Sequence, residues 1–135
     1  MSAVLKSVGA ITLFVEDPRR SKAFYERTFD VPAIYEDENS VVFKFENTLI
    51  NLLEATEAPG LIAPAAVAGA DAGASMQFSI WVDDADAVCA ELAARGVVLL
   101  NGPISRPWGM RTACFADPDG HVWEIAQELS DAGAA

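Results

Sequence analysis

Glu124 is the residue of this chain with the clearest capacity for chemistry. It is the one acidic residue inside an apolar, β-prone segment that runs from Val122 to Ala126. A carboxylate in a half-buried strand can bind a cation, ligate a metal ion or accept a proton, and each of these roles needs other groups beside it. The role of Glu124 therefore depends on which side chains the fold places next to it.

A tight turn precedes Glu124. Asp117-Pro118-Asp119-Gly120 has a proline where type I turns favour one, an aspartate that can bond to the following backbone, and a glycine at the exit. The segments on either side, Thr112 to Ala116 and Val122 to Ala126, are apolar and β-prone, so the sequence predicts a hairpin. His121 lies three residues before Glu124, an odd separation in a strand. We therefore expect His121 on the opposite face, beside the turn, without a catalytic role.

The same succession of elements occurs twice along the chain. In the first half, Asp17-Pro18 predicts a helix start, and the second half offers Asp83-Asp84 as the matching cap, followed by a helix that ends at Gly96. The strands predicted by apolar, β-prone composition are Val8 to Val15, Ala33 to Glu36, Val41 to Glu46 and Thr48 to Glu54, then Ser75 to Val82, Val97 to Leu100, Arg111 to Ala116 and His121 to Gln127. Each half is thus a strand, a helix and three strands.

This repetition predicts one domain, residues 1–128, made of two βαβββ modules. The modules cover about residues 1–54 and 75–128, and residues 129–135 form a C-terminal tail. The segment 55–74 is rich in Ala, Gly and Pro, which predicts a linker with at most a short helical piece through Pro64 to Ala68. The expected fold class is α+β: a curved, eight-stranded mixed sheet with helices on its outer face and a groove on its inner face.

Alternation along the strands indicates which side chains face the groove. In the last strand Trp123 and Ile125 are expected to pack on a helix, which leaves Glu124 facing inward. The same argument applied to the other inner strands gives a groove lined by amides, aromatic rings and one acid: Ala10, Thr12, Phe14, Asn51, Leu53, Gln77, Ser79, Trp81, Val122, Glu124 and Ala126.

The charge and apolar content of the chain limit the classes of partner and the cellular location that we expect. The net charge is −11, from nine basic and twenty acidic residues. Phosphate binding needs a basic face, so we expect neither nucleic acid nor an anionic membrane as a partner. The acidic surface either only keeps the protein soluble or also attracts a cationic ligand. The apolar run Val8 to Val15 is far shorter than the roughly 20 residues of a membrane span, which predicts a cytoplasmic protein. The spacing of Cys89 and Cys114 indicates neither a disulfide bond nor a zinc site, so both are expected to be free thiols.

The whole chain up to about Gln127 resembles the vicinal oxygen chelate superfamily. The resemblance rests on the repeated modules, on the run Val15-Glu-Asp-Pro-Arg-Arg-Ser-Lys-Ala-Phe-Tyr25, and on the turn at Asp117 followed by Glu124. This superfamily includes glyoxalase I, extradiol dioxygenases, fosfomycin-resistance enzymes and bleomycin-resistance binding proteins. The resemblance implies a homodimer, because related proteins complete their grooves by pairing two chains.

The resemblance also implies where a metal would bind. Metal-dependent members draw His, Gln or Glu ligands from four groove positions, which here hold Ala10, Asn51, Gln77 and Glu124. Alanine has no donor atom and Asn51 is a weak neutral donor, whereas a catalytic divalent site usually needs three protein ligands. We therefore expect no metal and no other cofactor.

The segment Arg106-Pro107-Trp108-Gly109 resembles the bleomycin-resistance branch, whose dimers sequester cationic aromatic antibiotics. The predicted function is accordingly metal-independent binding of a cationic or aromatic small molecule. Its expected contacts are Phe14, Asn51, Gln77, Trp81, Trp108 and Glu124. Trp108 could equally be a hydrophobic plug at the edge of the core, and Trp81 either a groove wall or a dimer contact.

Two alternatives concern Glu124 itself. In a metal-dependent glyoxalase-like lyase or isomerase, or in a dioxygenase, Glu124 would ligate a divalent metal or act as a general base. In a purely structural role, Glu124 would accept hydrogen bonds from groove donors such as Gln77 and would contribute only to the specificity of the fold.

Overall fold

The computed structural model describes residues 4–129 of the 135-residue chain. The chain divides into two compact units, Met1–Ala70 and Asp71–Ala135. Apart from Leu129, the expected C-terminal tail lies outside the described residues. Among the helices of residues 4–129, none is long and apolar enough to cross a membrane.

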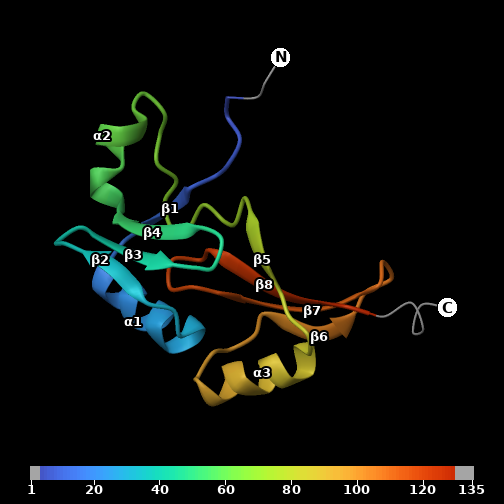
Figure 1. Cartoon of the computed structure of the whole chain (residues 1–135). Coiled ribbons are helices and arrows are strands. Elements are labelled where there is room, and N and C mark those ends of the chain that lie inside the picture. The colour runs from blue at the N-terminus through green and yellow to red at the C-terminus, as the bar shows by residue number, and fades with distance from the viewer. Residues whose placement is uncertain (1–3, 130–135) are drawn as a thin grey trace. The chain divides into compact units, whose positions relative to one another are not determined.

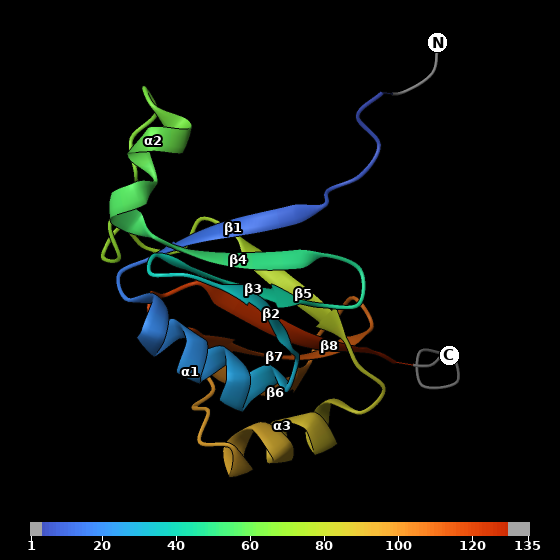
Figure 2. The ribbon, with the colours of Figure 1, turned by 60° about the vertical axis from the view of Figure 1, so that its left-hand side comes forward.

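The first unit has the predicted strand, helix and three strands. In chain order these are β1 (Ala10–Val15), α1 (Pro18–Phe29), β2 (Ala33–Glu36), β3 (Ser40–Lys44) and β4 (Leu49–Glu54). They form a four-stranded sheet in the order β1-β4-β3-β2, in which β1 runs parallel to β4 and the other neighbours are antiparallel (Figure 1). The 3₁₀ helix η1 (Ala55–Glu57) and the short helix α2 (Pro59–Ile62) then lead away from the end of β4 (Figures 1 and 2).

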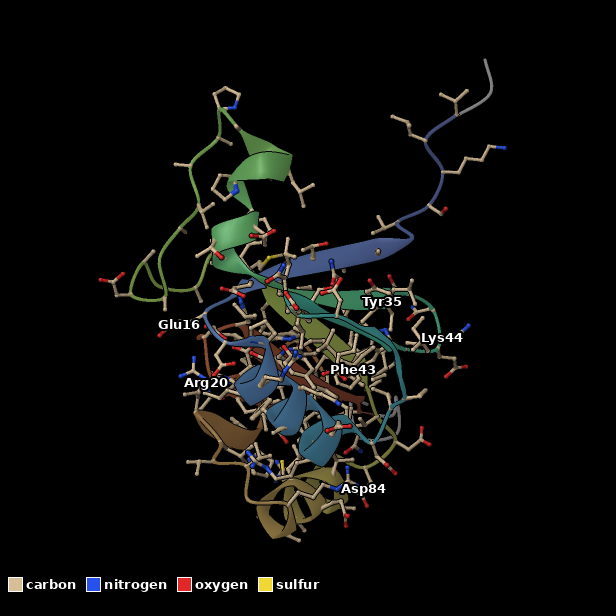
Figure 3. All side chains as sticks on the ribbon, turned by 90° about the vertical axis from the view of Figure 1, so that its left-hand side faces the viewer. Glu16, Arg20, Tyr35, Phe43, Lys44 and Asp84 are labelled. Carbon is tan, nitrogen blue, oxygen red and sulfur yellow. The ribbon has the colours of Figure 1, made fainter. Side chains whose placement is uncertain are left out.

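Helix α1 begins and packs as its sequence predicts. The carboxylate of Asp17 accepts hydrogen bonds from the backbone N–H groups of Arg19 and Arg20, and Pro18 occupies the first turn, where no backbone donor is needed. The buried face of α1 places Tyr25 against Phe43 of β3, with ring centroids 5.8 Å apart. Figure 3 shows Lys44, the next residue of β3, extending outward instead, as strand alternation requires.

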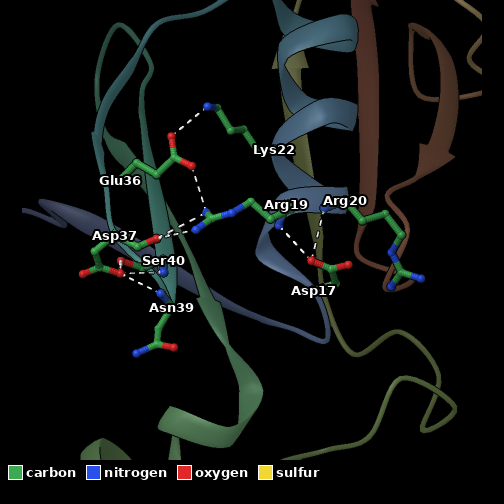
Figure 4. A network of polar contacts seen from close by, with 8 residues as sticks. All are labelled: Asp17, Arg19, Arg20, Lys22, Glu36, Asp37, Asn39 and Ser40. Carbon is green, nitrogen blue, oxygen red and sulfur yellow. Dashed lines mark hydrogen bonds and ion pairs between the residues drawn. The ribbon is translucent and has the colours of Figure 1, made fainter.

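An ion-pair network ties α1 to β2 (Figure 4). The Glu36 carboxylate accepts hydrogen bonds from Lys22 Nζ at 2.7 Å and from Arg19 Nη1 at 2.8 Å. The Lys22 ammonium, opposed in part by desolvation, holds the pKa of Glu36 below its usual range. The Asp37 carboxylate caps the following turn through the backbone N–H groups of Asn39 and Ser40.

The second unit repeats the plan. Its elements are β5 (Gln77–Trp81), α3 (Ala85–Ala94), β6 (Asn101–Ser105), β7 (Met110–Ala116) and β8 (Val122–Glu128), and the sheet order is β5-β8-β7-β6. The carboxylate of Asp84 accepts from the backbone N–H of Ala87, which caps α3, and Gly96 adopts a left-handed φ of 82° just after the helix. Helix α3 packs against β6, β7 and β8.

The turn between β7 and β8 has the predicted hairpin geometry. Asp117 Oδ1 accepts hydrogen bonds from the backbone N–H groups of Asp119 and His121, each at 2.9 Å. The backbone N–H of Gly120 donates to the Asp117 carbonyl. Asp117 and Asp119 are buried, so this turn is an ordered part of the unit that fixes where β8 starts.

The α+β class and the two βαβββ modules are therefore confirmed, and the eight strands are divided between two four-stranded mixed sheets. Two local expectations are wrong. Val97 to Leu100 is not a strand, because Val97 is buried and its backbone N–H donates to the Leu92 carbonyl at the end of α3; β6 starts at Asn101. The helical segment after β4 ends at Ile62, before Pro64 to Ala68, since Pro59 starts it earlier.

Candidate binding face on the second sheet

Four polar side chains form a row across the second sheet, on the face turned away from α3. The strand register pairs Ser79 with Glu124, Glu124 with Cys114, and Cys114 with Asn101. Directly paired residues point to the same side of a sheet. The opposite face carries the buried residues Phe115, Trp123 and Ile125.

Glu124 is anchored in this row by Ser79. The Ser79 Oγ donates a hydrogen bond of 2.7 Å to Glu124 Oε1. Gln77, named above as one possible donor in a structural role of Glu124, lies two residues before Ser79 on β5, opposite Val122, and is exposed. Sequence alternation already placed Ser79 on this face, but only the register shows that it stands directly beside the carboxylate.

Arg106 folds back over the same face. Its Nε donates to Thr112 Oγ1 at 3.0 Å, and its Nη2 donates to Asn101 Oδ1 at 3.3 Å. Asn101 in turn donates from Nδ2 to Cys114 Sγ at 3.2 Å. The sequence pattern places Arg106 only in the loop that carries Trp108, and strand alternation does not predict a guanidinium on this face.

Two exposed tryptophans border the row. Trp81 lies on β5, two residues beyond Ser79 on the same face, and is 74% exposed. Trp108 lies in the turn between β6 and β7 and is 69% exposed, which excludes a plug in the core of this unit. The Arg106 guanidinium lies 5.9 Å from the centroid of the Trp108 ring, so a cation of the protein itself already contacts this ring. Trp123 is buried as expected.

The two expected site residues of the first unit lie on the corresponding face of the first sheet, opposite to that on which Leu13, Val15, Ile50 and Leu52 are buried. Phe14 is half-buried and pairs with Leu53, and Asn51 pairs with Thr12. Asn51 Nδ2 donates to Thr12 Oγ1 at 3.4 Å, while Asn51 Oδ1 is buried without a hydrogen-bond partner.

The four positions at which the superfamily places metal ligands do not fit a divalent ion here. Ala10 has no donor atom, Asn51 and Gln77 offer neutral amide oxygens, and Glu124 is the one carboxylate. Among residues 4–129, no three His, Cys, Asp or Glu side chains gather in a way that could hold a metal ion. One carboxylate and two neutral amides are a poor donor set for a catalytic divalent ion.

The sequence model of the glyoxalase/bleomycin resistance protein/dioxygenase superfamily matches residues 7–125. The chain belongs to this superfamily, in agreement with its two βαβββ modules and with the resemblance found in its sequence. A comparison with curated proteins gave no match.

Solved structures of the superfamily share the fold. A glyoxalase/bleomycin resistance protein/dioxygenase from Nocardioides is 20% identical, with a TM-score of 0.85 over 96% of this chain and 87% of its own. A glyoxalase-related enzyme from Fulvimarina pelagi is 24% identical, with a TM-score of 0.78 over 92% of this chain and 89% of its own. A lactoylglutathione lyase from Agrobacterium tumefaciens is 19% identical, with a TM-score of 0.73 over 93% of this chain and 96% of its own. At these identities the likeness extends to the fold alone.

Proposed function

We propose that this protein is a metal-independent small-molecule binding protein, which sequesters a planar aromatic compound with a cationic group, such as an antibiotic of the bleomycin type. One observation carries the proposal. A single face of the second sheet combines the Ser79-anchored carboxylate of Glu124 with two tryptophans that are more than two-thirds exposed. Large exposed aromatic side chains beside a fixed charge are typical of ligand-binding surfaces.

The chemistry of each group suggests its part in binding. Glu124 would accept a hydrogen bond from the cationic group of the guest, with a strength of about 1.5–3 kcal/mol typical of bonds to charged groups. Trp81 and Trp108 would stack on the aromatic rings, which contributes about 0.5–1.5 kcal/mol for each pair beyond the buried area. The net charge of −11 would favour the approach of a positively charged guest. Phe14 and Asn51 of the first unit and Gln77 of the second remain proposed ligand-binding residues.

A titration followed by tryptophan fluorescence tests the proposal. Bleomycin-type, mitomycin-type and other cationic aromatic compounds are added to the protein and to its Trp108→Ala and Glu124→Gln variants. We expect saturable quenching by at least one compound and an affinity loss of about tenfold in Glu124→Gln. Leu61→Ala, which removes an equally exposed apolar side chain from α2, serves as the control. Absence of saturable quenching, or unchanged affinity in both site variants, would contradict the proposal.

A second candidate is an enzyme of the same superfamily, a metal-dependent lyase, isomerase or dioxygenase. It is favoured by the similarity of the fold to that of a lactoylglutathione lyase. Metal analysis of protein purified without chelator separates the two candidates. A stoichiometric amount of Zn, Ni, Mn or Fe would reverse their order.

The assembly and the compartment are also proposals. We infer a homodimer, because the resemblance to the superfamily implies paired chains, and a cytoplasmic location, because the apolar run Val8 to Val15 is too short to span a membrane. Light scattering coupled to size-exclusion chromatography would give twice the chain mass of 14.4 kDa for a dimer. A mass equal to that of the single chain would contradict it.

A further inference from the structure

Arg106 has no acidic partner, unlike four other basic residues of the described chain. Arg19, Lys22, Arg95 and Arg111 each contact a carboxylate at 2.7–3.1 Å. The Arg106 guanidinium instead contacts three neutral partners: Thr112, Asn101 and the ring of Trp108. Among residues 4–129, no carboxylate is paired with it, although the chain has twenty acidic residues. A half-buried guanidinium held on a binding face without a counter-charge is a site for an oxyanion.

The contacts of Arg106 leave donors free and fix the direction of the guanidinium. A guanidinium has five N–H groups, and the two hydrogen bonds of Arg106 use the Nε–H and one N–H of Nη2. The remaining N–H groups of Nη1 and Nη2 are available for a bidentate bond to a carboxylate. Because Thr112 is buried and Asn101 is itself bonded to Cys114, the guanidinium is held in place before any ligand arrives.

Arg106 and Glu124 lie at a spacing that one small molecule can bridge. Glu124 is on β8, whereas Thr112 and Asn101, which hold the guanidinium, are on the next two strands, β7 and β6. Neighbouring strands are about 4.8 Å apart, so the two charges are separated by roughly 5–10 Å across the sheet. This is the length of one or two fused aromatic rings with a charged substituent at each end.

We propose that the ligand of this face is a zwitterionic aromatic compound, whose ammonium group binds Glu124 and whose carboxylate binds Arg106. The inference rests on the proposed binding function and narrows it from cationic guests to guests that also carry an anionic group. Trp108 would cover the carboxylate–guanidinium pair, because its ring lies 5.9 Å from the guanidinium. Trp81, at the other edge of the sheet, would cover the ammonium end.

Three probes with one naphthalene core test the pairing of charges. These are 6-(aminomethyl)-2-naphthoate, which has both charges, 6-methyl-2-naphthoate, which has only the carboxylate, and (6-methyl-2-naphthyl)methylamine, which has only the ammonium group. Their affinities are measured by isothermal titration calorimetry at low salt for the wild type, Arg106→Gln and Glu124→Gln. We expect the zwitterion to bind about tenfold more tightly than either singly charged probe.

The variants should separate the two contacts. Arg106→Gln keeps an N–H donor for Thr112 but removes the charge, so we expect about tenfold weaker binding of the zwitterion and of the naphthoate, with unchanged binding of the amine. Glu124→Gln should weaken the zwitterion and the amine but leave the naphthoate unchanged. Arg95→Gln makes the same change of charge at the end of α3 and should leave all three affinities unchanged. Circular dichroism and thermal unfolding establish that each variant is folded.

Each contrary outcome has a definite meaning. If the amine binds as tightly as the zwitterion and Arg106→Gln alters neither affinity, Arg106 only braces the β6–β7 turn and the inference is wrong, while the binding function stands. If no naphthalene probe binds but a cationic antibiotic quenches the tryptophans saturably, the zwitterionic ligand is again excluded and the function stands. If neither set of compounds binds, both the function and the inference fail.

Discussion

The two units of this protein have the same backbone plan but carry different chemistry on their open faces. Each unit has a cross-strand row at the same place in its sheet. The row of the first unit is Thr12, Asn51, Val42 and Tyr35, and that of the second is Ser79, Glu124, Cys114 and Asn101. A hydroxyl thus stands beside a neutral amide in one unit and beside a carboxylate in the other. The shared backbone provides the positions, and the side chains alone decide which face can bind a charged group.

The hydrogen bond to Glu124 in the second unit is shorter than the one made by Asn51 in the first. Ser79 donates to the Glu124 carboxylate at 2.7 Å, a short charge-assisted bond. Asn51 donates to Thr12 at 3.4 Å, a long neutral bond, and its carbonyl oxygen is buried without a partner. The second unit therefore holds a carboxylate fixed by a short hydrogen bond, whereas the first holds an incompletely satisfied amide.

The ion pairs between helix and sheet show the opposite arrangement in the two units. In the first unit the helix supplies the cations, Arg19 and Lys22, and strand β2 supplies Glu36. In the second unit helix α3 supplies Asp86, and strand β7 supplies Arg111. Both units thus join the helix to the sheet by ion pairs, but the helix is the basic partner in the first unit and the acidic partner in the second.

The edge strand of the second unit should be the more sensitive to mutation. Gly102 has a φ of 92°, and an added Cβ would lie 2.6 Å from Ala113 Cα and also clash with the Thr112 carbonyl. We expect Gly102→Ala to lower the free energy of unfolding by about 3 kcal/mol, because both the clash and the left-handed conformation disfavour a side chain. Chemical denaturation measures this loss.

The matching change in the first unit is Ile34→Ala, at the irregularity of β2, where the side chain is 52% exposed. Its expected cost is below about 1 kcal/mol. Equal costs for Gly102→Ala and Ile34→Ala would show that the two edges are equivalent.

Asn51 and Glu124 occupy the matching positions of the two rows, and we expect a change of charge to affect stability differently at each. Asn51→Asp would place a carboxylate where the existing oxygen is buried and the neighbour on β3 is Val42, so we expect a loss of about 1–2 kcal/mol at neutral pH. Glu124→Gln keeps an oxygen that can accept from Ser79, and we expect a change within about 0.5 kcal/mol. Urea denaturation of both variants measures the difference. A larger loss in Glu124→Gln would contradict this account of the two faces.

Removing the hydroxyl of Ser79, beside Glu124, and that of Thr12, beside Asn51, compares the two hydrogen bonds directly. We expect Ser79→Ala to cost about 1 kcal/mol, because the bond to the carboxylate is short but lies on an exposed face. Thr12→Val removes only the long bond to an amide and should cost less than about 0.5 kcal/mol. Thermal unfolding ranks the two variants, and the reverse ranking would show that the 2.7 Å bond contributes less than its geometry indicates.

The smallest expected effect on stability is that of removing an ion pair between helix and sheet, such as Asp86–Arg111. The bond from Arg111 holds the pKa of Asp86 below its usual value, as Lys22 does for Glu36. The stabilisation is therefore complete above the ordinary carboxyl pKa of about 4, and it is lost as the pH falls through the lowered value of the folded state. We expect Asp86→Asn to lower the Tm slightly at pH 7.

Thermal unfolding between pH 7 and pH 2 checks this dependence. The difference in Tm between the wild type and Asp86→Asn should shrink as the pH falls below about 4. Glu36→Gln should behave in the same way in the first unit, since its carboxylate is also stabilised in the charged form. A difference in Tm that stays constant down to pH 2 would mean that the ion pair is not its cause.

The sequence by itself determined the local features of both units. Asp17-Pro18 and Asp84 start the helices, the Asp117 turn starts β8, and alternation assigns Glu124 to the face away from the helix. Each of these depends on hydrogen bonds or sterics within a few residues, so neighbouring residues are sufficient to predict them. Together with the repeat, they were also sufficient to identify the superfamily.

The tertiary structure decided which side chains stand next to one another. Ser79 rather than Gln77 faces Glu124, because the register of β5 against β8 joins residues 45 positions apart in the chain. Strand β6 is irregular around Gly102, where its backbone approaches Thr112 and Ala113 of β7 too closely for a side chain. Arg106 lies on the candidate binding face because Thr112 and Asn101, on two different strands, accept its hydrogen bonds. Pairing of this kind is a property of the whole sheet, which no local sequence pattern encodes.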